Sequence, residues 1–145
     1  MPGIDIAVET QRTVSERAHH CCEYGQSRAD DATASFAVEH MVPVSRGGTR
    51  ALHNLALSCA GCNGHKYNRT EAPAPTDGTP ASFFNPRQQR WHEHLCWNEH
   101  YTHIIGLTPT GRATVEALRL NRPGLVNMRH VLYGLGKHPP DLPEA

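Results

Sequence analysis

The chain has 145 residues, with 14 Lys plus Arg balanced by 14 Asp plus Glu. This length suits one compact domain with a hydrophobic core, and it excludes two independent domains of ordinary size. No run approaches the ~18 apolar residues of a membrane span, and the first residues lack the pattern of a secretory signal, so we expect a cytoplasmic protein without a membrane partner.

The predicted elements begin with a short polar helix over residues 8–20. Residues 36–42 are rich in strand-forming side chains and end at Pro43, which cannot donate to a sheet. Residues 54–58 offer a second stretch of strand length, and residues 59–69 predict a helix entered through a cysteine-bearing turn. The order strand, strand, helix predicts a hairpin followed by a helix.

The second half of the chain begins with a proline-rich stretch, residues 71–80, which we interpret as a linker. A covering loop and one or two strands are expected next. Thr108 is a plausible N-cap with Pro109 after it, which predicts a helix ending near Asn121. A last helix over 123–135 carries an apolar stripe that we expect to face the core.

These elements together predict an α+β fold in a single domain, residues 1–145. Within it we expect a core over residues 17–70, the linker over 71–80, and an extension packed on the core over 81–138. The extension should contain a strand and two helices.

Basic side chains are concentrated in residues 36–70, although the whole chain is neutral. The only acid in that stretch is Glu39. A local excess of positive charge is what a phosphate-contacting surface needs, although a solvated face gives the same pattern. The candidate DNA-contacting residues are Arg46, Arg50, His65, Lys66 and Arg69.

The stretch from Val38 to Lys66 carries side chains suited to phosphodiester hydrolysis. A neutral imidazole such as His40 can take a proton from water near neutral pH. Glu39 and the amide oxygen of Asn63 are donors of the kind Mg²⁺ prefers. Lys66 follows Asn63 by three residues on a helix, where it can act as a point charge toward a phosphate.

The order of these motifs resembles the HNH endonucleases, members of the ββα-metal or His-Me finger superfamily. The resemblance runs through EH at 39–40, GG at 47–48, NL at 54–55, and CxxCN followed by HK at 59–66. It implies a ββα-metal core with His40 as the general base. It also implies that Asn54 braces the loop that orients His40, that Mg²⁺ or Mn²⁺ is the catalytic cofactor, that DNA is the partner, and that no small-molecule cofactor is needed.

By the same resemblance, Glu39 and Asn63 would hold the catalytic metal. Glu39 stands where Asp or His is more usual in the family. Adjacent strand residues face opposite ways, so Glu39 and His40 can share a site only if the strand bends at its end.

The cysteines predict a structural zinc site with an incomplete ligand set. Zinc-bearing HNH proteins often carry one CxxC before the hairpin and another at the helix start. Here Cys59 and Cys62 form the second pair, whereas the first is reduced to Cys22 because Gly25 replaces its companion. Two alternatives remain open: packing alone holds the turn, or zinc is bound with a fourth group drawn from Cys21, His20, His19 or water.

The main hypothesis is therefore a metal-dependent HNH endonuclease that hydrolyses DNA phosphodiester bonds. The alternative is a non-catalytic nucleic-acid-binding or structural zinc module that retains the HNH fold. Nicking of DNA with a divalent cation separates the two hypotheses.

Overall fold

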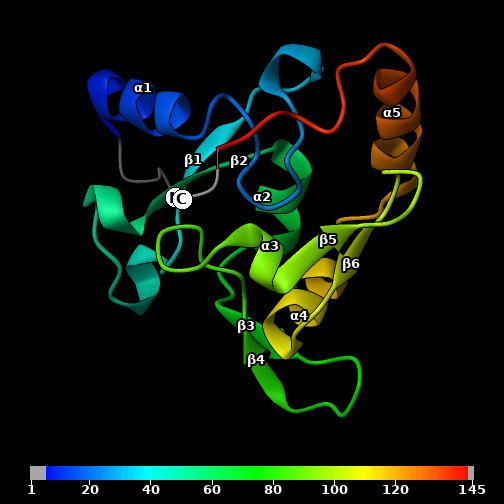
Figure 1. Ribbon diagram of the computed structural model, residues 1–145. Coiled ribbons are helices and arrows are strands. Elements are labelled where there is room, and N and C mark those ends of the chain that lie inside the picture. Colours follow the sequence, from blue (N-terminus) through cyan, green and yellow to red (C-terminus); the bar gives the residue numbers. More distant parts are fainter. Residues whose placement is uncertain (1–5, 144–145) are drawn as a thin grey trace.

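The computed structural model describes residues 6–143 and has a mixed α+β architecture with three small antiparallel sheets in that range (Figure 1). The helices and strands are α1 (Val8–Arg17), β1 (Ala37–His40), β2 (Leu55–Ser58), α2 (Ala60–Lys66), β3 (Glu71–Pro73), β4 (Pro80–Ser82), α3 (Trp91–His94), β5 (Leu95–Trp97), β6 (Ile104–Gly106), α4 (Pro109–Ala117) and α5 (Pro123–Gly134). None of the helices in these residues is long and apolar enough to cross a membrane.

The hairpin formed by β1 and β2 lies near the centre of the molecule and leads directly into α2 (Figure 1). Its register pairs His40 with Leu55 and Glu39 with Ala56. Helix α1 covers the hairpin, because its buried Val14 packs with Leu55 and Leu57 in a small apolar cluster. The predicted order of strand, strand and helix is observed, with each element shorter than its sequence pattern.

The proline-rich stretch differs from the expected linker, because its ends pair as the hairpin β3–β4. Pro73 lies opposite Pro80 at the end of the ladder next to the connecting turn, and Gly78 takes a positive φ of 75° in that turn. Proline is tolerated there because a short edge ladder loses few hydrogen bonds. The hairpin packs on α4, where Ala81 meets Ala113 in a cluster of small side chains.

The largest apolar cluster joins the two halves of the chain. It brings the cysteine-bearing turns together with side chains from α3, β5, β6 and the end of α4: Cys22, Tyr24, Cys59, Cys62, Ala72, Phe83, Phe84, Trp91, Leu95, Ile104, Leu118 and Leu120. The indole of Trp91 also donates a hydrogen bond to the Tyr24 carbonyl at 2.8 Å. Residues 81–120 therefore complete the core around the cysteines.

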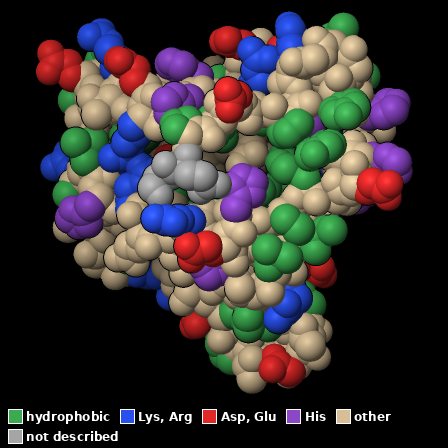
Figure 2. All heavy atoms as spheres, in the orientation of Figure 1, with side chains coloured by type: hydrophobic (Ala, Val, Ile, Leu, Met, Phe, Trp, Pro, Cys, Tyr) green, Lys and Arg blue, Asp and Glu red, His purple; other side chains and the backbone are tan. Residues whose placement is uncertain are grey.

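Helix α5 begins at Pro123 as predicted, but within its apolar stripe only Leu132 is buried. Met128, Val131 and Leu135 are exposed, and Figure 2 shows hydrophobic side chains on the surface in this region. The helix is attached instead through buried Arg129, whose guanidinium donates to the carbonyls of Leu120 and Thr102 and lies over the Trp97 ring. The expectation of a buried stripe therefore holds only at Leu132, and a buried arginine also attaches this helix to the body.

Candidate active site and cysteine cluster

The loop between β1 and β2 is held by the side chain of Asn54. Its Oδ1 accepts from the Val42 N–H at 2.9 Å, and its Nδ2 donates to the carbonyls of Val42 at 3.0 Å and Thr49 at 2.8 Å. Gly48 makes the close approach possible, since a Cβ there would lie 1.7 Å from the Val42 oxygen. Asn54 is itself buried. The chain directly after His40 is therefore fixed in position.

His40 ends β1 and is partly exposed, yet its Nε2 atom is buried and has no hydrogen-bond partner. Burial lowers the pKa of His40, and the nearby cations Arg50 and Lys66 lower it further. The imidazole is therefore neutral at pH 7 with a nitrogen free to accept a proton.

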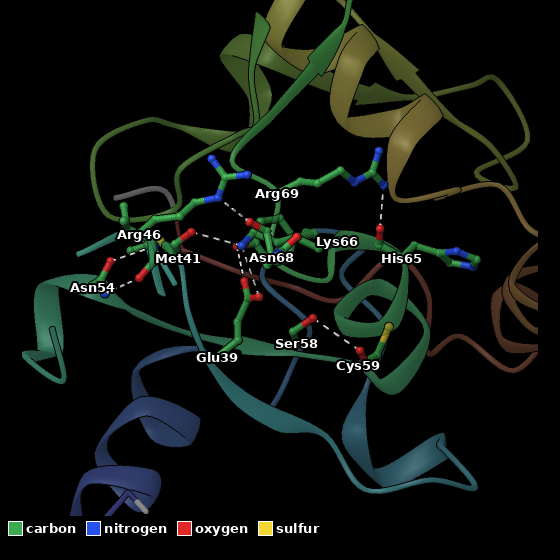
Figure 3. A network of polar contacts seen from close by, with 12 residues as sticks. Glu39, Met41, Arg46, Asn54, Ser58, Cys59, His65, Lys66, Asn68 and Arg69 are labelled. Atoms are coloured by element: carbon green, nitrogen blue, oxygen red, sulfur yellow. Dashed lines mark hydrogen bonds and ion pairs between the residues drawn. The ribbon is translucent and has the colours of Figure 1, made fainter. Parts of the chain in front are cut away.

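Glu39 lies in a buried network between β1 and α2 (Figure 3). Its Oε2 is 3.5 Å from the Lys66 Nζ, and its Oε1 accepts a hydrogen bond from the Tyr24 hydroxyl. The Lys66 ammonium also donates to the Met41 carbonyl at 3.0 Å. Burial raises the pKa of Glu39, while Lys66 and Tyr24 oppose that shift. The side chain of Lys66 is only 2% exposed, so here its charge stabilises Glu39 and the Met41 backbone.

The expected Mg²⁺ ligands do not present an open pair of oxygens. Both Glu39 oxygens face Tyr24 and Lys66, and the carboxylate is buried. Asn63 lies on α2 one turn before Lys66 and is partly buried. In this arrangement Glu39 does not fit a Mg²⁺ ion, because the Lys66 ammonium neutralises the carboxylate that the ion needs.

Some of the candidate DNA-contacting side chains are exposed, and others make hydrogen bonds within the protein. Arg50 and Arg46 are exposed, although the Arg46 Nε donates to the Asn68 carbonyl at 2.9 Å (Figure 3). Arg69 donates to the carbonyls of His65 at 2.6 Å and Ala117 at 3.3 Å, so it ties the end of α2 to α4. The structure therefore leaves Arg46 and Arg50 as the cations best placed to meet a phosphate backbone.

Three cysteines meet at the start of α2. The Sγ atoms of Cys22, Cys59 and Cys62 all lie within 4.8 Å of one another, and the three residues are buried. Cys59 is the N-cap of α2, and its Sγ accepts from the Cys62 N–H at 3.4 Å. Hydrogen bonds from the Cys22 and Cys62 thiols lower the pKa of Cys59. Three thiols at this spacing fit the ligand set of a tetrahedral zinc ion.

The other proposed zinc ligands lie outside this group. Within residues 6–143 the group of clustered metal-ligating side chains consists of the three cysteines and does not include Cys21, His19 or His20. Cys21 is buried in a β-bridge with Arg28, and the two histidines are exposed at positive φ. Among the described residues, the cluster therefore has three thiols and no fourth metal-ligating side chain.

Sequence reasoning missed two residues that shape these sites. Tyr24 follows Cys22 by two residues in the CCEYG stretch, and the sequence signals its role only by placing a hydroxyl next to the cysteine-bearing turn. Arg122 reaches Cys59 from a position 63 residues further along the chain. No local pattern points to that contact, because it depends on how α5 packs.

Comparison with known proteins supports the resemblance in the middle of the chain. Among protein families, HNH endonuclease matches residues 20–69, the range that contains the hairpin, α2 and the three clustered cysteines. No curated protein and no solved structure gives a match. Residues 20–69 of this chain are therefore similar to the HNH endonuclease family.

Proposed function

We propose that the chain is a metal-dependent HNH endonuclease that hydrolyses DNA phosphodiester bonds, and that β1, β2 and α2 form its ββα-metal core. The family match over residues 20–69 supports a nuclease-type function. The observation that carries the proposal is the state of His40: neutral, with a buried Nε2 that has no partner, and followed by a loop that Asn54 fixes. A general base for water must be neutral and must have a nitrogen that can accept a proton.

In the proposed reaction His40 takes the proton of the attacking water at Nε2. Asn54 keeps the backbone after His40 in place, which orients the ring relative to the scissile phosphate. Arg46 and Arg50 bind the DNA backbone through charge, so affinity falls as salt rises. Little sequence readout is expected from contacts of this kind.

A divalent cation, Mg²⁺ or Mn²⁺, would supply neutralisation of the charge that develops on the phosphate oxygens. Asn63 is a candidate oxygen donor for it, as is Glu39 in a state in which Lys66 has left the carboxylate. Because Lys66 holds Glu39 in the present arrangement, we assign no step to that pair.

The cysteine cluster is proposed to hold a structural zinc ion through Cys22, Cys59 and Cys62. The ion would join the turn before β1 to the start of α2, in the part of the core that residues 81–138 cover. Such a site stabilises a fold with few apolar residues of its own. We also propose that the whole chain forms one domain, because residues from both halves of the chain share the apolar cluster around these cysteines.

A second candidate function, a non-catalytic nucleic-acid-binding or structural zinc module, is favoured by one observation. The buried pair of Glu39 and Lys66 occupies the place where the family resemblance expects a metal ligand. A non-catalytic protein could retain the zinc cluster and the exposed Arg46 and Arg50 of the loop between β1 and β2, while an ion pair occupies its catalytic metal site.

The test is nicking of supercoiled plasmid DNA with Mg²⁺ or Mn²⁺, with and without EDTA. The proposal expects cleavage that EDTA abolishes, and a loss of roughly a hundredfold or more in His40→Ala, the usual scale for removing a general base. The matched control is His53→Ala, an exposed histidine of the neighbouring loop, which should cleave like the wild type. Asn63→Ala should weaken cleavage at limiting Mg²⁺.

DNA binding and circular dichroism are measured on the same proteins. A folded His40→Ala protein that nicks at the wild-type rate would place the base elsewhere. A wild type that binds DNA but does not cut it with any divalent cation would establish the non-catalytic module.

A further inference from the structure

A cavity of about 220 Å³ lies beside the cysteine cluster. It opens between the turn at Gly25, the start of α2 and helix α5, and its lining includes Gly25, Cys59, Gly61, Arg122 and Arg129. Cys22 and Cys62 are fully buried, whereas Cys59 retains 7% exposure. The cluster therefore meets the cavity on the side formed by Cys59 and Gly25.

Gly25 leaves a corner of the cluster without a side chain. A Cβ built on Gly25 would lie 3.9 Å from the Cys62 Sγ and 3.7 Å from the Leu120 Cδ2, which are ordinary contact distances. The space is therefore large enough for a side chain that the sequence does not provide. A tetrahedral zinc ion bound to the three thiolates would have its remaining position open.

Arg122 lies against the same group of sulfur atoms. Its Nη2 is 3.6 Å from the Cys59 Sγ and its Nη1 is 3.9 Å from the Cys62 Sγ. Gly61 provides the clearance, because a Cβ at that position would come within 2.5 Å of the Arg122 Nη2. The guanidinium can approach because Gly61, one of the two residues between Cys59 and Cys62, has no side chain in its way.

A second cation, the buried Arg129, lies near the partly exposed Arg122. The Arg129 Nη2 is 3.9 Å from the place that a Gly25 Cβ would take, and the residue is 4% exposed. Both arginines line the cavity. A thiolate-bound zinc ion with three ligands carries a net negative charge, and an added anion increases that charge. Two guanidinium groups at this distance would offset it and make an anion more favourable there than a neutral ligand.

We infer that the zinc ion keeps an exchangeable fourth position that takes a small anion from the cavity, and that Arg122 selects the anion. The inference rests on the zinc site proposed above and adds the ligand class to it. A site closed by four protein ligands would exclude such a molecule, whereas this one combines an open corner, a cavity and a cation within hydrogen-bonding distance of two sulfur atoms.

The test uses the full chain loaded with Co²⁺ in place of zinc, because the visible bands of cobalt report its ligands directly. Azide is the anionic probe and imidazole is the neutral one. Azide should shift the bands in a saturable manner and should bind more tightly than imidazole. Gly25→Cys should abolish both responses, because its thiolate fills the open position.

Arg122→Gln should weaken azide binding about tenfold or more, the scale of losing a hydrogen bond to a charged group, while imidazole binding is unchanged. Gly61→Ala keeps Arg122 but displaces its guanidinium, so it should also weaken azide binding. Arg90→Gln is the matched control, since that exposed arginine pairs with Glu93 and does not line the cavity.

Cobalt that binds through thiolates but ignores azide would overturn the inference and leave the zinc proposal standing. Equal loss of azide and imidazole binding in Arg122→Gln would overturn the selective role of the arginine. A protein that takes up neither cobalt nor zinc would overturn the zinc site and the inference together.

Discussion

Lys66 and Glu39 form an ion pair, 3.5 Å between Nζ and Oε2, with side chains that are 2% and 5% exposed. A buried pair of this kind costs desolvation on both sides, so its net stabilisation over an apolar pair is small. Removing one partner has a larger effect, because the other is left charged and buried.

Lys66→Met should therefore lower the free energy of unfolding by about 3 to 5 kcal/mol at pH 7. The pKa of Glu39 is already raised by burial, and it should rise further without the ammonium. The loss should then shrink as the pH falls through the raised pKa, since protonated Glu39 needs no counter-charge. Urea unfolding across pH measures this. The double variant Glu39→Gln with Lys66→Met should recover most of the loss, and equal instability of both variants would contradict the account.

Asn54→Ala should lose about 1 to 3 kcal/mol of stability, because it leaves the Val42 N–H and neighbouring carbonyls without partners. Cleavage should fall more than stability accounts for, since the chain after His40 is no longer fixed. Gly48→Ala should act similarly through its clash with the Val42 oxygen. Thermal unfolding and nicking rates are compared with Asn127→Ala, an exposed asparagine on α5. A stable Asn54→Ala protein with full activity would argue against the brace.

The pH profile of cleavage should follow the lowered pKa of His40. The unprotonated ring is the active form, so the rate should rise with pH through a midpoint below ~6.5, the ordinary histidine value, and level off above it. Burial is the main cause of the shift, and Arg50 adds to it. Arg50→Gln should therefore raise the midpoint, while Arg46→Gln weakens DNA binding without moving it. Midpoints that agree in all three proteins would contradict the role of Arg50.

The zinc proposal predicts that purified protein holds substoichiometric or readily lost zinc. Gly25→Cys should raise both zinc content and melting temperature, because a fourth thiolate closes the ligand set. Gly64→Cys is the matched control: its side chain would point into open space on the exposed surface of α2. Metal analysis and thermal unfolding decide the matter. One tightly held zinc per wild-type chain would mean that the existing ligands suffice.

Local sequence signals predicted the main elements of the fold because several of them begin or end next to a characteristic boundary residue. Pro43 follows the end of β1, Cys59 caps α2, and Pro109 and Pro123 stand at the first positions of α4 and α5. The prolines act through their fixed backbone geometry and Cys59 acts through its own side chain, and neither effect depends on distant parts of the chain.

The contacts that define the sites depend on tertiary packing and could not be predicted in this way. Lys66 was expected to face a phosphate, but the fold turns it toward the Glu39 carboxylate and the Met41 carbonyl, which come from another segment. The approach of Arg122 to Cys59 spans 63 residues. The exposure of most of the α5 stripe has the same cause, since the spacing of apolar residues does not reveal that buried Arg129 attaches the helix together with Leu132.

The hydrogen bond from the Trp91 indole to the Tyr24 carbonyl gives the protein a built-in optical reporter. Tyr24 lies between Cys22 and Gly25, so any loosening of the cysteine turn changes the surroundings of a buried tryptophan. The second tryptophan, Trp97, packs against Trp91 at 5.6 Å between ring centroids and is carried on β5. Tryptophan emission should therefore change when metal is removed from the cysteine cluster, although no tryptophan is a metal ligand. The rate of chelation can then be followed without attaching a dye.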